Sequence, residues 1–275
     1  MKVVRYGSYG QHVKFCQATL DFLGYELSVD GHCGKKTRAA IKAFQNDHGL
    51  KDDGVCGPLT WAALGFRATK NKNIACIELP FERILSAGVL LEDGRKMSCM
   101  KFAQYGFDIV LNGGFFELAT LKSCTCIYEY GKLQCYGNAN SGIAYLQTDG
   151  SQFVSAYPLT RAEAAGKPVD MLCGAPVLIQ NGVKCLDMEG ISQATYTKKT
   201  RRTCAAVTDK AVLLFFSMAN MSLEDMLEEG LNQKVTYMQG HDGGGSQSLV
   251  IGGNWVLTTD GRSIPSAVGF VVRKW

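Results

Sequence analysis

The sequence predicts an α+β protein made of a small three-helix module followed by a larger, sheet-dominated domain. In residues 1–66, apolar residues recur at helical spacing between two similar turns. From residue 74 to residue 275 there are many short strand-like runs and few helical stretches. Residues 67–73 (RATKNKN) are short, polar and cationic, as expected of a linker. A chain of 275 residues is long enough for two unequal domains.

The composition is that of an ordinary globular chain, with 46% hydrophobic and 20% charged residues and a net charge of +4. This mild excess suits an anionic polymer such as cell wall, and no basic run is dense enough to indicate nucleic acid. The longest apolar stretch, residues 211–216, is far shorter than the ~20 residues that span a bilayer. The first residues lack the apolar core of a signal peptide. We therefore expect a protein made in the cytoplasm, with no membrane span and no evident export route.

The eleven cysteines are scattered over both segments, and their number is odd. Secreted disulfide scaffolds are usually short and have an even count, so we favour small buried thiols in a reducing compartment. Cys124 and Cys126 form a C-x-C pair without a matching second half, which disfavours a zinc site. We expect no metal and no cofactor.

A turn pattern occurs twice in residues 1–66. The stretch D-G-H-C-G-K-K-T at 30–37 is repeated 23 positions later as D-G-V-C-G-P-L-T at 53–60. In each copy Asp-Gly and a second Gly suit a tight turn, where a positive φ has no steric cost for glycine. A helix-like stretch follows each turn, and Pro58 stands where a first helical residue tolerates proline. The pattern predicts three short helices joined by two similar turns.

These residues resemble the peptidoglycan-binding domain type 1 family. The match runs from G-Q-H-V at 10–13, through F-Q at 44–45 and G-L at 49–50, to D-G-V-C-G-P-L-T-W at 53–61. It covers essentially the whole segment and keeps the family order. Cys33 departs from the pattern, because the family usually has an aromatic residue there. The resemblance implies a cell-wall anchor without catalysis of its own.

In the larger segment we expect strands at 107–111, 142–146, 176–179, 204–207, 212–216 and 267–272. The clearest helix start is Ser222, an N-cap candidate followed by acidic residues in the first turn. Three polar clusters stand beside the strand-like runs: N-G-G-F-F at 112–116, R-R-T at 201–203 and H-D-G-G-G-S at 241–246. Glycine runs at strand ends let the backbone approach a ligand closely. One such run is usually only a turn, but three together indicate a site.

The order of these clusters resembles the phosphodiester glycosidase family, which includes the N-acetylglucosamine-1-phosphodiester alpha-N-acetylglucosaminidases. Family motifs match N-G-G-F-F at 112–116, G-x-P-x-L-I-x-x-G at 174–182, R-T at 202–203, D-G-G-G-S at 242–246 and R-x-I-P-x-x-V-G at 262–269. The resemblance covers about residues 74–275. Gly240 and His241 depart from the family, which commonly has a hydrophobic residue and Leu or Asn before the D-G-G-G-S motif. Residues 117–126 also lack the expected glycines. These departures bear on the fine specificity for the substrate more than on the class of reaction.

A sugar 1-phosphodiester has a good leaving group, because a phosphate monoester anion departs with little need for protonation. One carboxylate and a cationic cradle could therefore suffice for its hydrolysis. The resemblance implies that Asp242 is this carboxylate, as nucleophile, base or oxocarbenium stabiliser; its alternative role is to cap the glycine run. Arg202 and Arg262 would hold the phosphate through planar forks, and otherwise would be solvated surface charges.

The remaining candidates are weaker. Asn112 could hydrogen-bond the sugar or the phosphate as part of the catalytic set. His241 could donate to phosphate or be a satisfied turn histidine, and Glu117 could be a second carboxylate. The other expected substrate-binding residues belong to the glycine runs: Gly113, Gly114, Gly243, Gly244 and Ser246.

These features favour a cell-wall-targeted hydrolase that cleaves a sugar, expected to be N-acetylglucosamine, from a sugar-1-phosphodiester. The pairing with an anchor suggests the teichoic acid linkage of the wall, reached after lysis as phage lysins do, although an internal sugar phosphodiester fits equally. The alternative is a non-catalytic wall or phosphoglycan-binding protein. A zinc amidase or peptidase is disfavoured because only one histidine, His241, lies outside the first module.

Overall fold

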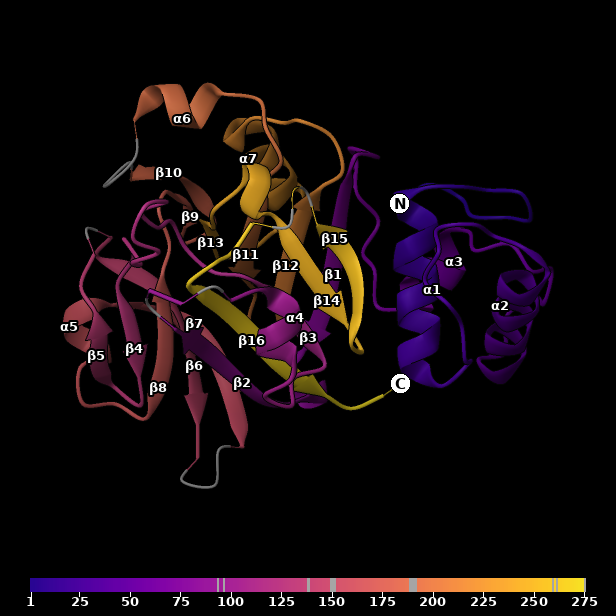
Figure 1. Cartoon of the computed structure of the whole chain (residues 1–275), viewed down its shortest axis with the longest axis horizontal. Coiled ribbons are helices and arrows are strands. Elements are labelled where there is room, and N and C mark those ends of the chain that lie inside the picture. The colour runs from indigo at the N-terminus through magenta and orange to yellow at the C-terminus, as the bar shows by residue number, and fades with distance from the viewer. Residues whose placement is uncertain are drawn as a thin grey trace.

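The computed structural model describes residues 1–92, 94–95, 97–137, 139–148, 152–187, 192–258, 260 and 262–274. A small helical module lies beside a larger, sheet-rich body (Figure 1). The predicted α+β class is therefore confirmed. Among the described residues, no helix is long and apolar enough to cross a membrane. All eleven cysteines lie in the described part of the chain, and eight of them are buried, as expected.

The helical module contains α1 (Gln11–Leu23), α2 (Lys35–Asp47) and α3 (Pro58–Ala63). Its repeated turns are held by equivalent glutamines. Gln17 accepts a hydrogen bond from the Gly31 N–H at 2.8 Å, and Gln45 accepts one from the Gly54 N–H at 2.9 Å. Both glycines have a positive φ, 79° and 72°. Each turn is thus fixed by a buried amide from the preceding helix, which explains why the pattern recurs.

As far as its residues are described, the larger domain is built from three antiparallel sheets. In spatial order, the first contains β1 (Ile74–Pro80), β12 (Ala211–Ser217), β11 (Thr203–Val207), β13 (Tyr237–Gly240), β9 (Val177–Gln180) and β10 (Val183–Asp187). The second contains β15 (Asn254–Thr258), β14 (Ser248–Ile251), β3 (Ile109–Asn112), β16 (Ser266–Val272) and β2 (Ile84–Leu91). The third contains β5 (Lys132–Cys135), β4 (Ile127–Glu129), β8 (Val169–Cys173), β6 (Ser141–Gln147) and β7 (Phe153–Thr160).

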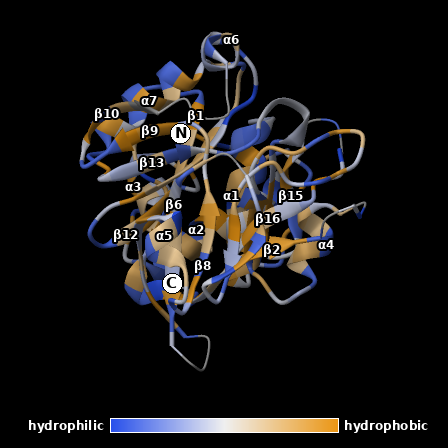
Figure 2. Cartoon of the chain, turned by 90° about the vertical axis from the view of Figure 1, so that its left-hand side faces the viewer, coloured by the Kyte–Doolittle hydropathy of each residue, from blue (hydrophilic) through white to orange (hydrophobic). Residues whose placement is uncertain are grey.

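Short helices pack on the sheets. The first sheet is covered by α7 (Leu223–Asn232), with α6 (Gln193–Thr197) against α7. The second carries α4 (Cys99–Ala103) and the third carries α5 (Arg161–Ala164). As predicted, Ser222 caps α7, in a reciprocal capping box with Asp225. The 3₁₀ turns are η1 (Phe81–Arg83) and η2 (Gly244–Ser246). Strands such as β9 are coloured as hydrophobic, whereas many loops are coloured as hydrophilic or neutral (Figure 2).

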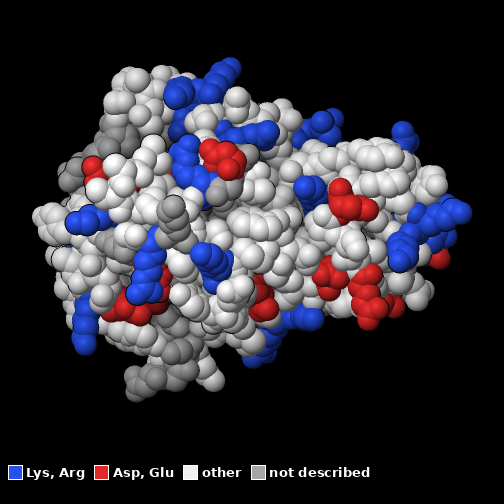
Figure 3. Space-filling view, viewed as in Figure 1, with Lys and Arg blue, Asp and Glu red and all other residues white. Residues whose placement is uncertain are grey.

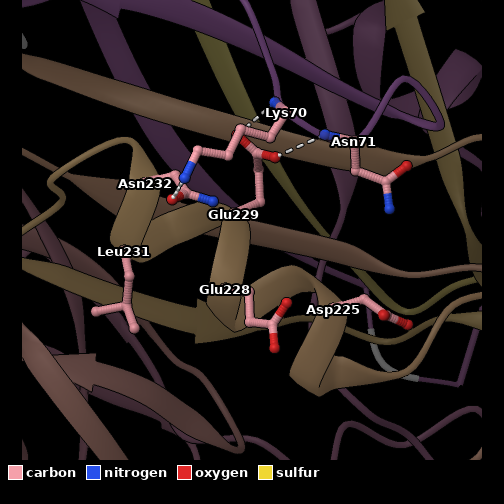
Figure 4. A pocket seen from close by; sticks show the side chains of 7 residues that line it. All are labelled: Lys70, Asn71, Asp225, Glu228, Glu229, Leu231 and Asn232. Atoms are coloured by element: carbon pink, nitrogen blue, oxygen red, sulfur yellow. Dashed lines mark hydrogen bonds between the residues drawn. The ribbon is translucent and has the colours of Figure 1, made fainter.

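The connection at residues 67–73 is fastened to the larger domain. Glu229, a buried residue of α7, accepts hydrogen bonds from the backbone N–H groups of Lys70 at 3.4 Å and Asn71 at 3.2 Å (Figure 4). Arg67 forms an ion pair with Glu78 of β1 at 2.6 Å. The predicted linker is therefore a packed segment that fixes the path of the chain between the modules.

The helical module packs against the edge of the second sheet, where α1 lies beside β15 (Figure 1). The amide of Asn254 donates to the Asp21 carboxylate at 2.8 Å. Gly252 packs on Phe22 so closely that an added Cβ would lie 2.9 Å from the Phe22 Cβ. Because α1 covers β15, the helical module shields an edge strand that would otherwise expose its face to solvent.

Candidate functional site

The three polar clusters predicted from the sequence meet at one place, where β3, β11 and β13 of two different sheets adjoin. The Asp242 N–H donates to the Gly113 carbonyl at 3.1 Å. The His241 N–H donates to the Thr203 carbonyl at 2.9 Å, and the Gly244 N–H donates to the Arg201 carbonyl at 2.8 Å. Backbone hydrogen bonds therefore join all three clusters in a single constellation.

The Asn112 side chain links the three clusters through hydrogen bonds. Its side-chain amide donates to the Asp242 carbonyl at 2.7 Å, and its oxygen accepts from the Thr203 hydroxyl and the Ser248 N–H, both at 3.1 Å. The side chain is buried, at 1% exposure. Since its polar atoms are hydrogen-bonded within the protein, Asn112 positions the Asp242 loop. Its amide is not exposed for the substrate contact that was expected from the sequence.

His241 has the satisfied environment that was one of its two predicted roles. Its Nδ1 lies 2.8 Å from the Asn112 carbonyl oxygen, so this nitrogen carries the proton, and its Nε2 lies 3.3 Å from the Gln239 amide nitrogen. Burial lowers the pKa of His241 to about 4. The imidazole is therefore neutral near pH 7 and tied on both sides to the protein.

Asp242 is the carboxylate at the centre of the site. Its side chain accepts the Gly243 N–H at 2.8 Å. Burial is the main influence and raises the pKa of Asp242, while the Ser246 hydroxyl, the Gly243 N–H and the charges of Arg262 and Arg202 oppose it. The Ser246 hydroxyl is buried, and within the described part of the chain its oxygen has no hydrogen-bond partner of ordinary geometry. A desolvated carboxylate beside cations is typical of catalytic groups.

The adjacent arginines at 201 and 202 have different environments. Arg202 is 3% exposed, and its guanidinium donates to the carbonyls of Met221 at 3.2 Å, Thr195 at 2.6 Å and Lys198. Burial lowers its pKa. Arg202 is therefore anchored by three backbone carbonyls, and only its Nη1 lacks a partner among the residues that the structure describes. The planar fork that the sequence argument expected to hold the phosphate is thus bonded largely to backbone carbonyls, and Arg202 is not the solvated surface charge that was its alternative.

Arg201 was missed by the sequence argument. It is half-buried, and its guanidinium makes no hydrogen bond or ion pair within the described ranges. In the sequence, only its position beside the R-T motif pointed to a role for Arg201 in the site. Because successive residues of an extended chain point to opposite faces, one arginine of the pair enters the core and the other faces outward.

Arg262 lies against the glycine run. It pairs with Asp260 at 3.2 Å, and a Cβ on Gly245 would collide with both side chains. A Cβ on Gly243 would likewise collide with the Arg201 carbonyl. The glycines are thus required for close loop packing around Asp242.

The other glycine run is packed in the same way, since Cβ atoms on Gly113 and Gly114 would collide with Ser266 and Thr125. Glu117 is exposed and accepts a hydrogen bond from the Thr120 hydroxyl at 2.5 Å. No contact in the described residues joins Glu117 to Asp242.

An open cleft of about 440 Å³ adjoins the glycine run. Its lining residues include Gln11 of α1, Arg201, Asn220, Gly245, Thr258 and Asp260. On the face that Figure 3 shows, basic side chains surround an acidic group in the upper part of the larger domain. Within the described part of the chain, no three His, Cys, Asp or Glu residues form a group that could hold a metal ion.

Residues 105–271, more than half of the chain, match the family described as phosphodiester glycosidase. The chain belongs to the phosphodiester glycosidase family. Residues 9–64 match the family described as putative peptidoglycan binding domain. Both resemblances seen in the sequence are thereby confirmed.

Solved structures support the fold of this glycosidase family member. The catalytic domain of the zebrafish N-acetylglucosamine-1-phosphodiester alpha-N-acetylglucosaminidase superposes with a TM-score of 0.57 at 18% identity, over 73% of this chain and 76% of that one. A hypothetical protein from Synechocystis superposes with a TM-score of 0.58 at 16% identity, over 76% of this chain and 61% of that one. At these identities the likeness shows the fold alone.

Two curated proteins are similar to a short part of the chain. The chain is 41% identical over 63 residues (22% of its length) to the N-acetylmuramoyl-L-alanine amidase CwlM of Mycobacterium tuberculosis. It is 40% identical over 58 residues (20% of its length) to the zinc D-Ala-D-Ala carboxypeptidase of Streptomyces albus G. The chain spans only 16% and 23% of the lengths of these relatives.

Proposed function

We propose that this phosphodiester glycosidase is a cell-wall-targeted enzyme that hydrolyses a sugar-1-phosphodiester, releasing N-acetylglucosamine. The observation that carries the proposal is the desolvated Asp242 carboxylate, which lies at the junction of three loops beside an open, cation-bearing cleft. The peptidoglycan-binding match at residues 9–64 supports the wall as the location of the substrate.

In this proposal the bond between the anomeric carbon and the phosphate oxygen breaks, and its electron pair leaves with the phosphate monoester. Water adds its oxygen to the anomeric carbon and releases a proton to the solvent or the phosphate. Asp242 stabilises the positive charge that develops on the sugar ring, either directly or by activating the water. One carboxylate is enough, because the phosphate departs without a general acid.

We assign the phosphate cradle to Arg201 and Arg262. Arg201 faces the cleft with no partner among the described residues, and Arg262 lies close enough for its charge to oppose the rise in the pKa of Asp242. Arg202, anchored by three carbonyls, then acts as a positioning residue that holds residues 195–198 beside the site. Asn112 and His241 are positioning residues of the same kind, because both hold the loop that carries Asp242.

The test is release of free N-acetylglucosamine from the methyl phosphodiester of N-acetylglucosamine 1-phosphate by the purified full chain. The exposed Lys36→Ala variant serves as a control outside the site. We expect turnover by the wild type and the control, and loss by orders of magnitude in Asp242→Asn. Binding of the phosphodiester without any turnover would instead favour the non-catalytic phosphoglycan-binding function.

We further propose that the natural substrate is the linkage between teichoic acid and peptidoglycan. In Gram-positive walls a GlcNAc-1-phosphate joins this polymer to the C6 oxygen of muramic acid, and cleavage by this reaction would leave phosphate on the muramic residue. Walls that carry teichoic acid should release polymer and, after acid hydrolysis, yield muramic acid 6-phosphate. Intact walls together with cleavage of the soluble phosphodiester would refute this substrate and leave the reaction class standing.

A further inference from the structure

We propose that the peptidoglycan-binding module forms one wall of the glycosidase cleft, and that the cleft takes the one or two sugars adjoining the scissile phosphate on its leaving-group side. The inference rests on the proposed function and deepens it. It gives the module a contact role in substrate recognition in addition to its role as an anchor.

The cleft spans both modules. Gln11, the first residue of α1, lines it from the helical module, while Arg201, Gly244 and Gly245 line it from the glycosidase domain. Asp242 precedes Gly244 by two residues, so the cleft adjoins the loop that carries the proposed catalytic carboxylate. A ligand that extends from the phosphate into this space would meet Gln11 within the same cleft.

The module is held rigidly in this position. The Gln11 amide donates to the Val256 carbonyl of β15, and Asn254 donates to Asp21 at 2.8 Å. The Lys274 ammonium lies 5.2 Å from the centre of the Phe22 ring, a cation–π contact across the same interface. An anchor on a flexible tether raises only the local concentration of the enzyme, whereas a fixed wall also contributes binding contacts.

The chemistry of the lining suits an acylated amino sugar. Gln11 and Asn220 bring amides, Thr258 brings a hydroxyl, and Met218 and Leu257 bring small apolar surfaces. Sugars present alternating hydroxyl donors and acceptors beside short apolar patches, and the amides and hydroxyl match that pattern.

The charge and size of the cleft agree with this occupant. Arg201 supplies a cation for the phosphate itself, while Asp260, the acidic residue of the lining, is paired with Arg262. A volume of about 440 Å³ lies within the range of roughly 300–1,000 Å³ that is usual for small-ligand sites.

Two full-chain variants separate cleft contact from module docking. Gln11→Ala and Asn254→Ala each remove one hydrogen bond between the modules, but only Gln11 lines the cleft. Both are placed in an Asp242→Asn background so that binding can be measured by calorimetry without turnover. The ligands are the methyl phosphodiester of N-acetylglucosamine 1-phosphate and the same phosphodiester on the C6 oxygen of a muramic-acid-containing disaccharide.

We expect Gln11→Ala to weaken binding of the disaccharide ligand about fivefold, the effect of one hydrogen bond, and to leave the methyl ligand unchanged. Asn254→Ala should change neither affinity. Equal effects on both ligands, no effect of Gln11→Ala, or the same loss in Asn254→Ala would overturn the inference. Failure of the proposed hydrolysis is a separate result, since it would be seen as absent sugar release by the wild type.

Discussion

Replacing Arg202 with lysine should destabilise the protein while retaining a positive charge near Asp242. The guanidinium donates to the carbonyls of Met221, Thr195 and Lys198 from one planar fork. An ammonium group on a lysine side chain cannot reach three separate carbonyls at once. The substitution therefore separates the geometric role of Arg202 from the role of its charge.

The magnitude follows from the lost hydrogen bonds. If lysine keeps one of the three bonds, two charge-assisted bonds disappear, and each contributes at least about 1.5 kcal/mol. A loss of about 3 kcal/mol lowers the melting temperature of a domain of roughly 200 residues by about 6–12 °C. The matched control is Arg201→Met, because Arg201 has no hydrogen-bond or ion-pair partner within the part of the chain that the structure describes.

The assay combines thermal unfolding, followed by circular dichroism, with kinetics at a temperature where both variants are folded. We expect Arg202→Lys to melt earlier and to retain most of its affinity for the phosphodiester. Arg201→Met should keep its melting temperature and show a KM for the phosphodiester raised about tenfold or more, the loss of a charge-assisted contact. The reasoning is refuted if Arg202→Lys melts within about 2 °C of the wild type while its KM rises as in Arg201→Met.

Three further predictions concern stability, pH and the anchor. Because burial raises the pKa of Asp242, the ionised carboxylate destabilises the folded protein at a pH above that pKa. Asp242→Asn should therefore have a higher melting temperature than the wild type at pH 7, and this difference should shrink as the pH falls toward 4. The pKa of His241 is lowered from 6.5 to about 4, so the free energy of unfolding of the wild type should fall by about 3 kcal/mol as the pH is lowered between these values. Urea unfolding of His241→Gln over the same pH range should lack this loss, and an equal loss in the variant would contradict the prediction. The fragment 1–66 should fold alone and sediment with purified peptidoglycan, and a folded fragment that stays in solution would count against anchoring.

Much of the fold could be predicted because its determinants are local. The Asp-Gly turns at 30–31 and 53–54 need glycine for a positive φ, and Ser222 with Asp225 satisfies the first N–H groups of α7. The six expected strands all occur, with ends that shift by at most two residues. Strands such as β5 escaped prediction, because it has only four residues, three of them exposed, and so short a run gives little periodic signal.

The site was predictable as a set of loops and less so at the level of side chains. The glycine clusters marked the strand ends that meet around Asp242. Which arginine of the adjacent pair faces the cleft depends on the register of the chain at the start of β11, which a motif does not reveal. The docking of α1 on β15 was also missed, because Phe15 and Phe22 fit the core of an isolated module equally well.

The central claim is that the enzyme breaks the bond between the sugar and the phosphate oxygen. Hydrolysis of the methyl phosphodiester of N-acetylglucosamine 1-phosphate in ¹⁸O-labelled water tests it most directly, with the mass of the methyl phosphate product as the readout. Attack at the anomeric carbon predicts methyl phosphate without the label, formed by the wild type and not by Asp242→Asn. Methyl phosphate that carries ¹⁸O would show attack at phosphorus and would contradict the glycosidase mechanism.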